Sequence, residues 1–356
     1  MQIPVYHIDA FTDKVFSGNP AAVCPLDQWL PGNVMQEIAA ENNLSETAFF
    51  MPKGGQYELR WFSPKTEIDL CGHATLASAF VVFNYLDSAL DIVRFFSPRS
   101  GALTVSREQD LLTMDFPSQP AEACEAPADL AAGLGAEPLE TLRASDYLAV
   151  FASEEEIAAL RPDMQRLARL DKRGVVVTAR GNEVDFVSRF FAPRVGVDED
   201  PVTGSSHCTL VPYWKSKLGK NTFHARQISA RGGELFCEDC GDRVRISGRA
   251  VSYMQGKIDM GDTVSRSWPS QESSRMDNTA ARGLLQTMID YFESGNKETD
   301  RAAKAILEWD DEHLKDWQAE IKRLRDEGEW TGIRAPEADI VAGALRSIQQ
   351  QLVRKQ

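Results

Sequence analysis

Arg60-Trp61-Phe62-Ser63-Pro64 and Arg189-Phe190-Phe191-Ala192-Pro193 are nearly the same five-residue stretch, 129 residues apart. The likeness continues upstream, where residues 35–39 resemble residues 164–168, and downstream, where Gly72 corresponds to Gly204. Self-similarity at a fixed spacing is the sequence signature of a repeated structure. The sequence therefore predicts two similar halves, each with the same order of strands and helices.

The first half shows both periodicities that such a fold requires. Apolar residues at helical spacing predict a helix over 29–42, and alternating or apolar runs predict strands over 47–51 and 57–62. Residues 76–85 are almost wholly apolar, and a helix that is hydrophobic all round should be buried. The strands expected at 92–96, 102–106 and 111–116 could wrap it. This pattern predicts a barrel around a central helix.

The second half repeats the pattern around a central helix expected at 205–217. Its strands are expected at 147–151, 175–179, 184–191, 225–230, 234–237 and 243–246. Ligand sites are common in the crevice between two domains, so the repeat predicts a site where the halves meet.

The composition changes after Gly261, where a polar segment at 265–274 reads as a linker. Helical spacing of apolar residues follows it, so we expect a helical extension. The predicted organisation is α+β, with two pseudo-symmetric β-barrel halves, each around a central helix, at residues 1–120 and 121–262, and a helical C-terminal extension at 263–356.

Charge and composition exclude several classes of protein. The 356 residues carry a formal net charge of -14, which disfavours binding to nucleic acid or to an anionic membrane surface. No apolar run is long enough to span a membrane, and the amino terminus resembles a strand rather than a secretion signal. Six scattered cysteines then indicate free thiols. We expect a cytoplasmic protein.

Two glycine turns open the central helices and carry the polar residues of most interest. They are Leu70-Cys71-Gly72-His73-Ala74-Thr75 and Asp200-Pro201-Val202-Thr203-Gly204-Ser205-Ser206-His207. The start of a helix offers unpaired N–H groups and a partial positive charge, so two facing turns could hold a carboxylate or a developing enolate. Each turn also has a titratable group beside it, His73 in one and Asp200 in the other.

Glu46 breaks the symmetry between the halves. It enters a hydrophobic strand, and the offset of 129 gives Val175 as its counterpart. An apolar setting disfavours the charged form of a carboxyl group, which suits proton transfer near neutral pH. Glu46 is therefore a candidate acid or base, although an ordinary glutamate at a strand edge would show the same pattern.

Four motifs together resemble the signature set of the PhzF-like family, within the diaminopimelate epimerase-like superfamily. They are Gly18-Asn19-Pro20-Ala21-Ala22-Val23, Ser45-Glu46-Thr47-Ala48-Phe49, Cys71-Gly72-His73-Ala74-Thr75 and Asp200-Pro201-Val202-Thr203-Gly204-Ser205. The resemblance covers residues 1 to about 260 and leaves the final segment outside.

The resemblance implies a homodimeric isomerase of a small carboxylate-bearing substrate that needs no metal or organic cofactor. In the phenazine-pathway member of the family a glutamate shuttles a proton during isomerisation of a dihydro-hydroxyanthranilate, and Glu46 matches it by motif. His73 and Asp200 match the other polar residues of that site. The expected substrate-binding residues are Asn19, Gly72, Thr75, Gly204, Ser205 and Ser206.

Two other interpretations stay open from the sequence. Cys71 stands just before a glycine, as in the cysteine-dependent racemases and epimerases, but those enzymes use two thiols and the second turn has none, while Cys208 lies one helical turn further on. The chain could also be a non-catalytic binding protein whose helical tail, with Trp309, Trp317 and Trp330, recruits a partner.

Overall fold

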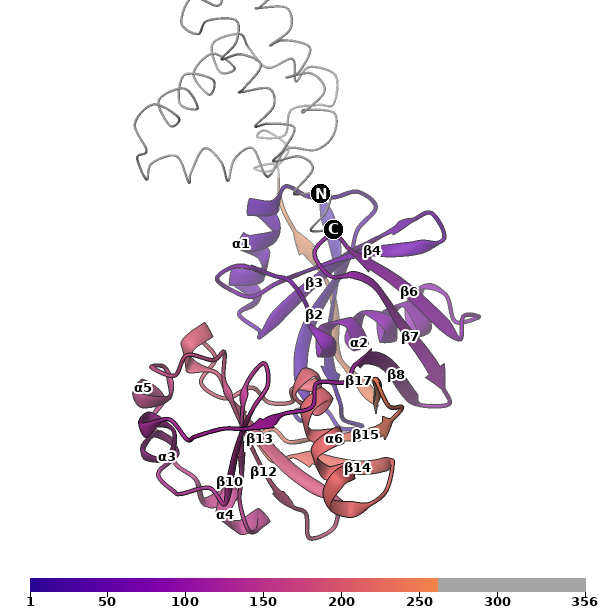
Figure 1. Ribbon diagram of the computed structural model, residues 1–356. Helices are drawn as coiled ribbons and strands as arrows, with labels where there is room; N and C mark the ends of the chain where they lie inside the picture. Colours follow the sequence, from indigo (N-terminus) through magenta and orange to yellow (C-terminus); the bar gives the residue numbers. More distant parts are fainter. Residues whose placement is uncertain (262–356) are drawn as a thin grey trace, which may run out of the picture. The chain divides into compact units, whose positions relative to one another are not determined.

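The computed structural model describes residues 1–261 (Figure 1). Met1–Met260 form one compact unit. The predicted helical extension at 263–356 lies outside the described residues. None of the helices within residues 1–261 has the length and the apolar run that crossing a lipid bilayer requires.

Seventeen strands within the described residues form two runs of hydrogen-bonded neighbours. The first run, in order of pairing, is β17 (Ala250–Asp259), β1 (Gln2–Ala10), β2 (Asn19–Pro25), β3 (Glu46–Lys53), β4 (Gln56–Phe62), β6 (Ile92–Ser97), β7 (Gly101–Glu108) and β8 (Leu111–Pro117), with β5 (Glu67–Ile68) also on β4. The second is β9 (Glu122–Ala123), β10 (Glu140–Arg143), β11 (Tyr147–Val150), β12 (Val175–Arg180), β13 (Phe186–Phe191), β14 (Thr222–Gln227), β15 (Gly233–Asp239) and β16 (Arg243–Gly248).

The two runs share one pattern of strand directions. In each, the third and fourth strands are parallel, the fifth and sixth are parallel, and all other neighbours are antiparallel. The antiparallel pair β8–β16 joins the last strand of one run to the last strand of the other. The internal repeat predicted from the sequence is therefore present in the strand pairing.

The five-residue stretch that revealed the repeat has the same role in both halves. Arg60 makes a two-pronged ion pair with Glu67, at 2.7 and 2.9 Å, and lies over the Phe62 ring. Arg189 makes the same pair with Glu199, at 2.7 and 2.9 Å, and lies over Phe191. Such planar forks have a fixed geometry, which explains why arginine stands at both positions.

The helices differ in how deeply they are buried. They are α1 (Gly32–Asn42), α2 (Gly72–Val81), α3 (Ala128–Leu134), α4 (Glu154–Ala159), α5 (Met164–Leu167) and α6 (His207–Leu218), with a π turn at Val82–Leu86 and 3-10 turns η2 (Pro193–Val195) and η3 (Gly204–Ser206). Nearly every side chain of α2 is buried, and α2 contacts strands β1, β2, β3, β7, β8 and β17. Complete burial of one large aliphatic side chain contributes about 1.5–3 kcal/mol, so this helix stabilises the first half strongly.

Two strands pair with the run that they do not follow in sequence. Strand β17 lies in the segment that the sequence analysis assigned to the second half, yet it pairs with β1 of the first run (Figure 1). Strand β9 follows the first half in sequence and pairs with β10 of the second run. One core cluster contains buried residues of both halves, among them Leu76 and Leu210.

Candidate active site

The four residues with the strongest chemical potential come from four segments. Asn19 begins β2, Glu46 begins β3, His73 is the second residue of α2, and Asp200 lies just before η3. Strands β2 and β3 are parallel, with Ala21 opposite Glu46, so their starts lie side by side. Helix α2 packs on both strands and also contacts η3. The fold thus brings these residues together where the two halves meet.

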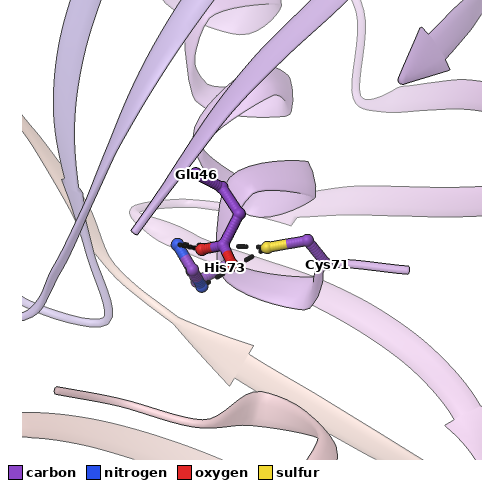
Figure 2. A group of neighbouring side chains, drawn as sticks. All are labelled: Glu46, Cys71 and His73. Carbon is purple, nitrogen blue, oxygen red and sulfur yellow. Dashed lines mark hydrogen bonds and ion pairs between the residues drawn. The ribbon is translucent and has the colours of Figure 1, made fainter. Parts of the chain in front are cut away.

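Glu46, His73 and Cys71 form a tight group at the start of α2 (Figure 2). Glu46 Oε2 lies 3.1 Å from His73 Nε2, and the two side chains are only 15% and 7% exposed. The Cys71 Sγ lies 3.5 Å from His73 Nδ1 and 3.9 Å from Nε2. A carboxylate, an imidazole and a thiol therefore share one buried space.

Asn19 connects this group to the second half. Its Nδ2 lies 3.2 Å from His73 Nδ1, and it donates to Asp200 Oδ1 at 2.8 Å and to the Val202 carbonyl at 2.9 Å. The other oxygen of Asp200, Oδ2, accepts from the Thr203 hydroxyl at 2.5 Å. Glu46, His73, Asn19 and Asp200 thus form one continuous polar chain between the halves.

Gln227 and Arg231, which were not among the predicted site residues, hold this chain in place. The Gln227 amide donates to the Asp200 carbonyl at 2.7 Å and accepts from the Thr203 amide at 2.9 Å. Arg231 donates to the carbonyls of Ser17 and Gly18 and to the Asp9 carboxylate. The residue before Asn19 is thereby tied to the second half. No local motif marks Gln227, whereas Arg231 stands in the Arg-Gly-Gly-Glu stretch at 231–234.

Burial sets the protonation of the thiol and of Asp200. Burial, and then the Glu46 carboxylate, raise the pKa of Cys71 to about 11, although His73 acts in the opposite direction. Burial also raises the pKa of Asp200, against the lowering effects of His73 and the Thr203 hydrogen bond. A thiol with this pKa is neutral at neutral pH and is a poor base.

His73 can hold a proton beside Glu46. Burial lowers its pKa, whereas the charges of Cys71 and Glu46 raise it, so the net shift is upward. Only the contribution of Glu46 applies near pH 7, where the Cys71 thiol is protonated. The Asn19 contact belongs to the neutral ring, whose Nδ1 accepts from the amide. A proton on both ring nitrogens would make Nδ1 a donor and would break this contact.

Comparison with known proteins identifies the family. The family model of phenazine biosynthesis-like proteins, PhzC-PhzF, matches residues 8–256. The chain belongs to this PhzF family. An uncharacterized isomerase of Pseudomonas aeruginosa is 54% identical over 258 residues, covering 72% of this chain and 99% of that protein. An uncharacterized isomerase of Halalkalibacterium halodurans is 47% identical over 264 residues, with the same coverage.

A solved structure has the same fold. The PhzF family protein of Enterococcus faecalis is 47% identical, and its crystal structure aligns with a TM-score of 0.72 over 73% of this chain and 100% of that one. The α+β fold of the family is thus present. The matched part corresponds in length to residues 1–261, and the sequence beyond it has no counterpart in these relatives.

The remaining predicted substrate-binding residues have different surroundings. Gly72 precedes His73 and is half-buried, and Gly204 is buried against Phe11. The half-buried Ser205 hydroxyl lies 3.4 Å from an Arg173 nitrogen. The hydroxyls of Thr75 and Ser206 donate instead to the carbonyls of Cys71 and Thr203, at 2.6 and 2.8 Å, so they bind within their own turns.

The strand ladder corrects the predicted counterpart of Glu46 by one residue. Thr47 faces Phe62 in β3–β4 as Val175 faces Phe191 in β12–β13, so the pairing equates Glu46 with Gly174 rather than with Val175. A Cβ atom at Gly174 would lie 2.6 Å from the Phe191 carbonyl oxygen. The second half therefore has no room for a side chain where the first half has its carboxylate.

A hollow of about 940 Å³ lies elsewhere, over strands of both runs. Its lining includes Arg107, Asp185, Lys220 and His224, and none of the predicted site residues. Charges of both signs face it. The chemistry described above does not extend to this surface.

Proposed function

We propose that this protein is an isomerase that removes and returns a proton at carbon in a small carboxylate-bearing substrate, with Glu46 as the acid and base. The observation that supports this most strongly is the continuous chain from Glu46 through His73 and Asn19 to Asp200. It places a carboxylate beside a proton-holding imidazole at the junction of the halves. The relatives named as isomerases support the reaction class.

The proposed step uses only groups that this chain supplies. The Glu46 carboxylate takes a proton from carbon next to the substrate carboxylate, and the bonding electrons move toward that carboxylate as an enolate-like state. Main-chain N–H groups at the starts of α2 and η3 face this charge and stabilise it. Glu46 then returns its proton to a different carbon, while His73 balances its charge. We also propose that each strand run curls into a barrel around its central helix, α2 in the first run and α6 in the second.

Cys71 is the weaker candidate for the acid and base. A pKa of about 11 leaves little thiolate, which is the reactive form. The residue equivalent to Cys71 in the second turn is Thr203, because each stands immediately before the glycine that opens the turn. A two-thiol reaction would need a cysteine there. We therefore assign the role of acid and base to Glu46, which is less buried than Cys71 and also contacts His73.

The test is proton exchange at carbon, followed by proton NMR in deuterated water. Cyclic and acyclic amino acids and dihydro-anthranilate-like carboxylates are incubated with the full-length wild type, with Glu46→Gln and with Glu41→Gln. Glu41 is an exposed glutamate on α1 and serves as the matched control. We expect wild type and Glu41→Gln to exchange the same compound, and Glu46→Gln to lose at least about 100-fold in rate, within the range of general acid–base catalysis. A folded, fully active Glu46→Gln would refute the proposal.

A further inference from the structure

We propose that Glu46, Cys71 and His73 form a binding site for a thiophilic divalent cation such as Zn²⁺. One ligand atom of each residue lies within 4.8 Å of those of the other two, and this is the group of three such residues found within the part of the chain that the structure describes. The three side chains supply oxygen, sulfur and nitrogen (Figure 2). That set suits Zn²⁺ and Co²⁺ and is a poor match for Mg²⁺ or Ca²⁺.

The distances are close to those of a tetrahedral site. Zinc bonds of about 2.0–2.3 Å at tetrahedral angles separate nitrogen from oxygen by about 3.3 Å and nitrogen from sulfur by about 3.6 Å. The corresponding distances from His73 Nε2 are 3.1 Å to Glu46 Oε2 and 3.9 Å to Cys71 Sγ. Sγ lies nearer to Nδ1, at 3.5 Å, than to Nε2, so the Cys71 side chain would have to turn toward the outer side of Nε2 to complete three ligands and leave the fourth position open.

A second observation points to the same atoms. Glu46 Oε2 is buried and makes no hydrogen bond within residues 1–261, since its ion-pair contact with His73 lacks hydrogen-bond geometry. Buried oxygens in native proteins rarely lack a partner, and a bound ion is one of the accepted reasons. Asn19 Oδ1 is likewise buried without a hydrogen bond among the described residues.

Binding at this site would oppose turnover. A cation on Glu46 takes up the electron pair that the proposed base needs, so this consequence, unlike the site itself, rests on the proposed function. Binding also requires the thiolate of Cys71, so each cation bound releases a proton. The site would make the protein sensitive to free zinc at the residues of its proposed chemistry.

The test uses Co²⁺, whose bonds to thiolate give a charge-transfer absorption band. Full-length protein freed of metal with a chelator is titrated with Co²⁺, and then with Zn²⁺ in competition, as wild type, Cys71→Ser and Cys240→Ser. Cys240 is exposed and close in sequence to a second thiol, Cys237, so it controls for binding at the other cysteines. We expect the band in wild type and Cys240→Ser, its loss in Cys71→Ser, and displacement by Zn²⁺ but not by Mg²⁺.

Other outcomes overturn the site. No band in wild type, or a band that survives Cys71→Ser and disappears in Cys240→Ser, would place the metal elsewhere or nowhere. If Cys71→Ser does not fold, Glu46→Gln and His73→Asn replace it in the test, because both keep the thiol. Each should lower the affinity for Co²⁺ by at least about 10- to 100-fold, which is what the loss of a residue that only supports a metal ligand costs. Unchanged affinity in both refutes the site. No substrate is present, so failure here leaves the exchange experiment untouched.

Discussion

Asn19 is the residue on which the two halves converge. Its side-chain nitrogen faces His73, Asp200 and the Val202 carbonyl, all of them buried or partly buried. A buried polar group that loses its hydrogen-bond partner still has the unfavourable free energy of desolvation, which nothing then offsets. Asn19 therefore contributes to the stability of the fold and also aligns His73 with Asp200.

We expect Asn19→Ala to lower the free energy of unfolding by about 1–3 kcal/mol, because the Asp200 carboxylate and the Val202 carbonyl lose their amide donor. The exchange rate should fall as well, since His73 and Asp200 lose their link. Urea unfolding and the NMR exchange assay measure the two effects. Asn182→Ala is the control: Asn182 is exposed and bonds only Glu154 and Glu155 among the described residues, so a shift within about 0.5 kcal/mol is expected. Equal losses in both variants would contradict this role.

His207 should make the fold sensitive to acid. Burial lowers its pKa from 6.5 to about 4, while the Thr203 carbonyl acts in the opposite direction. Between these values the unfolded chain binds a proton that the folded chain does not, so its contribution to stability is complete above pH 6.5 and is lost as the pH falls toward 4. Linkage puts that contribution at about 3 kcal/mol.

His207→Phe should remove this part of the acid sensitivity. The Thr203 carbonyl keeps the Ser206 hydroxyl as a donor, and the Phe186 ring lies beside the imidazole, so an aromatic replacement fits the surroundings. Unfolding free energies at pH 7 and pH 5 should differ less in the variant than in wild type, by about 2 kcal/mol. The other histidines contribute equally to both proteins. Identical pH slopes would refute the assignment.

At the scale of elements, the residue just before β12 shows why the second half cannot carry a carboxylate equivalent to Glu46. A methyl group on Gly174 would meet the Phe191 carbonyl and the Phe190 ring at 2.6–2.7 Å. We expect Gly174→Ala to destabilise the fold by about 1–3 kcal/mol through overpacking. Gly256→Ala, on the exposed β17, meets only an ordinary contact of 3.8 Å with Val5 and is the control. Thermal and urea unfolding compare the two, and similar losses would show that β12 can adapt.

The sequence predicted the elements better than their ends. The apolar run at 76–85 predicted the central helix, but α2 begins at Gly72, because a glycine, a histidine and small residues carry little helical signal. The first helix was expected from Trp29, whereas α1 begins at Gly32, just after Pro31. Asn19 contacts His73, 54 residues away, and Asp200, 181 residues away. Gln227 binds Asp200 across 27 residues, and Arg231 binds Asp9 across 222. Periodicity cannot show such pairs.

At the scale of the molecule, the core crosses from one half to the other. The β8–β16 ladder places Ile246 opposite Met114 and Val244 opposite Phe116, all of them buried. A single cluster continues from there into both central helices. The halves share an interior, so we expect residues 1–260 to unfold as one cooperative unit.

Ile246→Ala tests this expectation. Truncation of a fully buried isoleucine costs about 2–5 kcal/mol. In the full-length chain, hydrogen exchange followed by mass spectrometry should show the same loss of protection in β3 of the first half as in β12 of the second. A loss confined to the second half would mean that the halves unfold separately.

The pairing of β9 and β17 also bears on how such a chain could arise. Strand β9 follows β8 of the first run and pairs with β10 of the second, and strand β17 follows β16 of the second run and pairs with β1 of the first. A single ancestral half would have carried a terminal strand with no place in its own sheet, and two copies could satisfy each other only by trading those strands. That arrangement is a domain-swapped dimer. Residues 1–260 contain the strand exchange of such a dimer within one polypeptide, in which only one half has room for the glutamate.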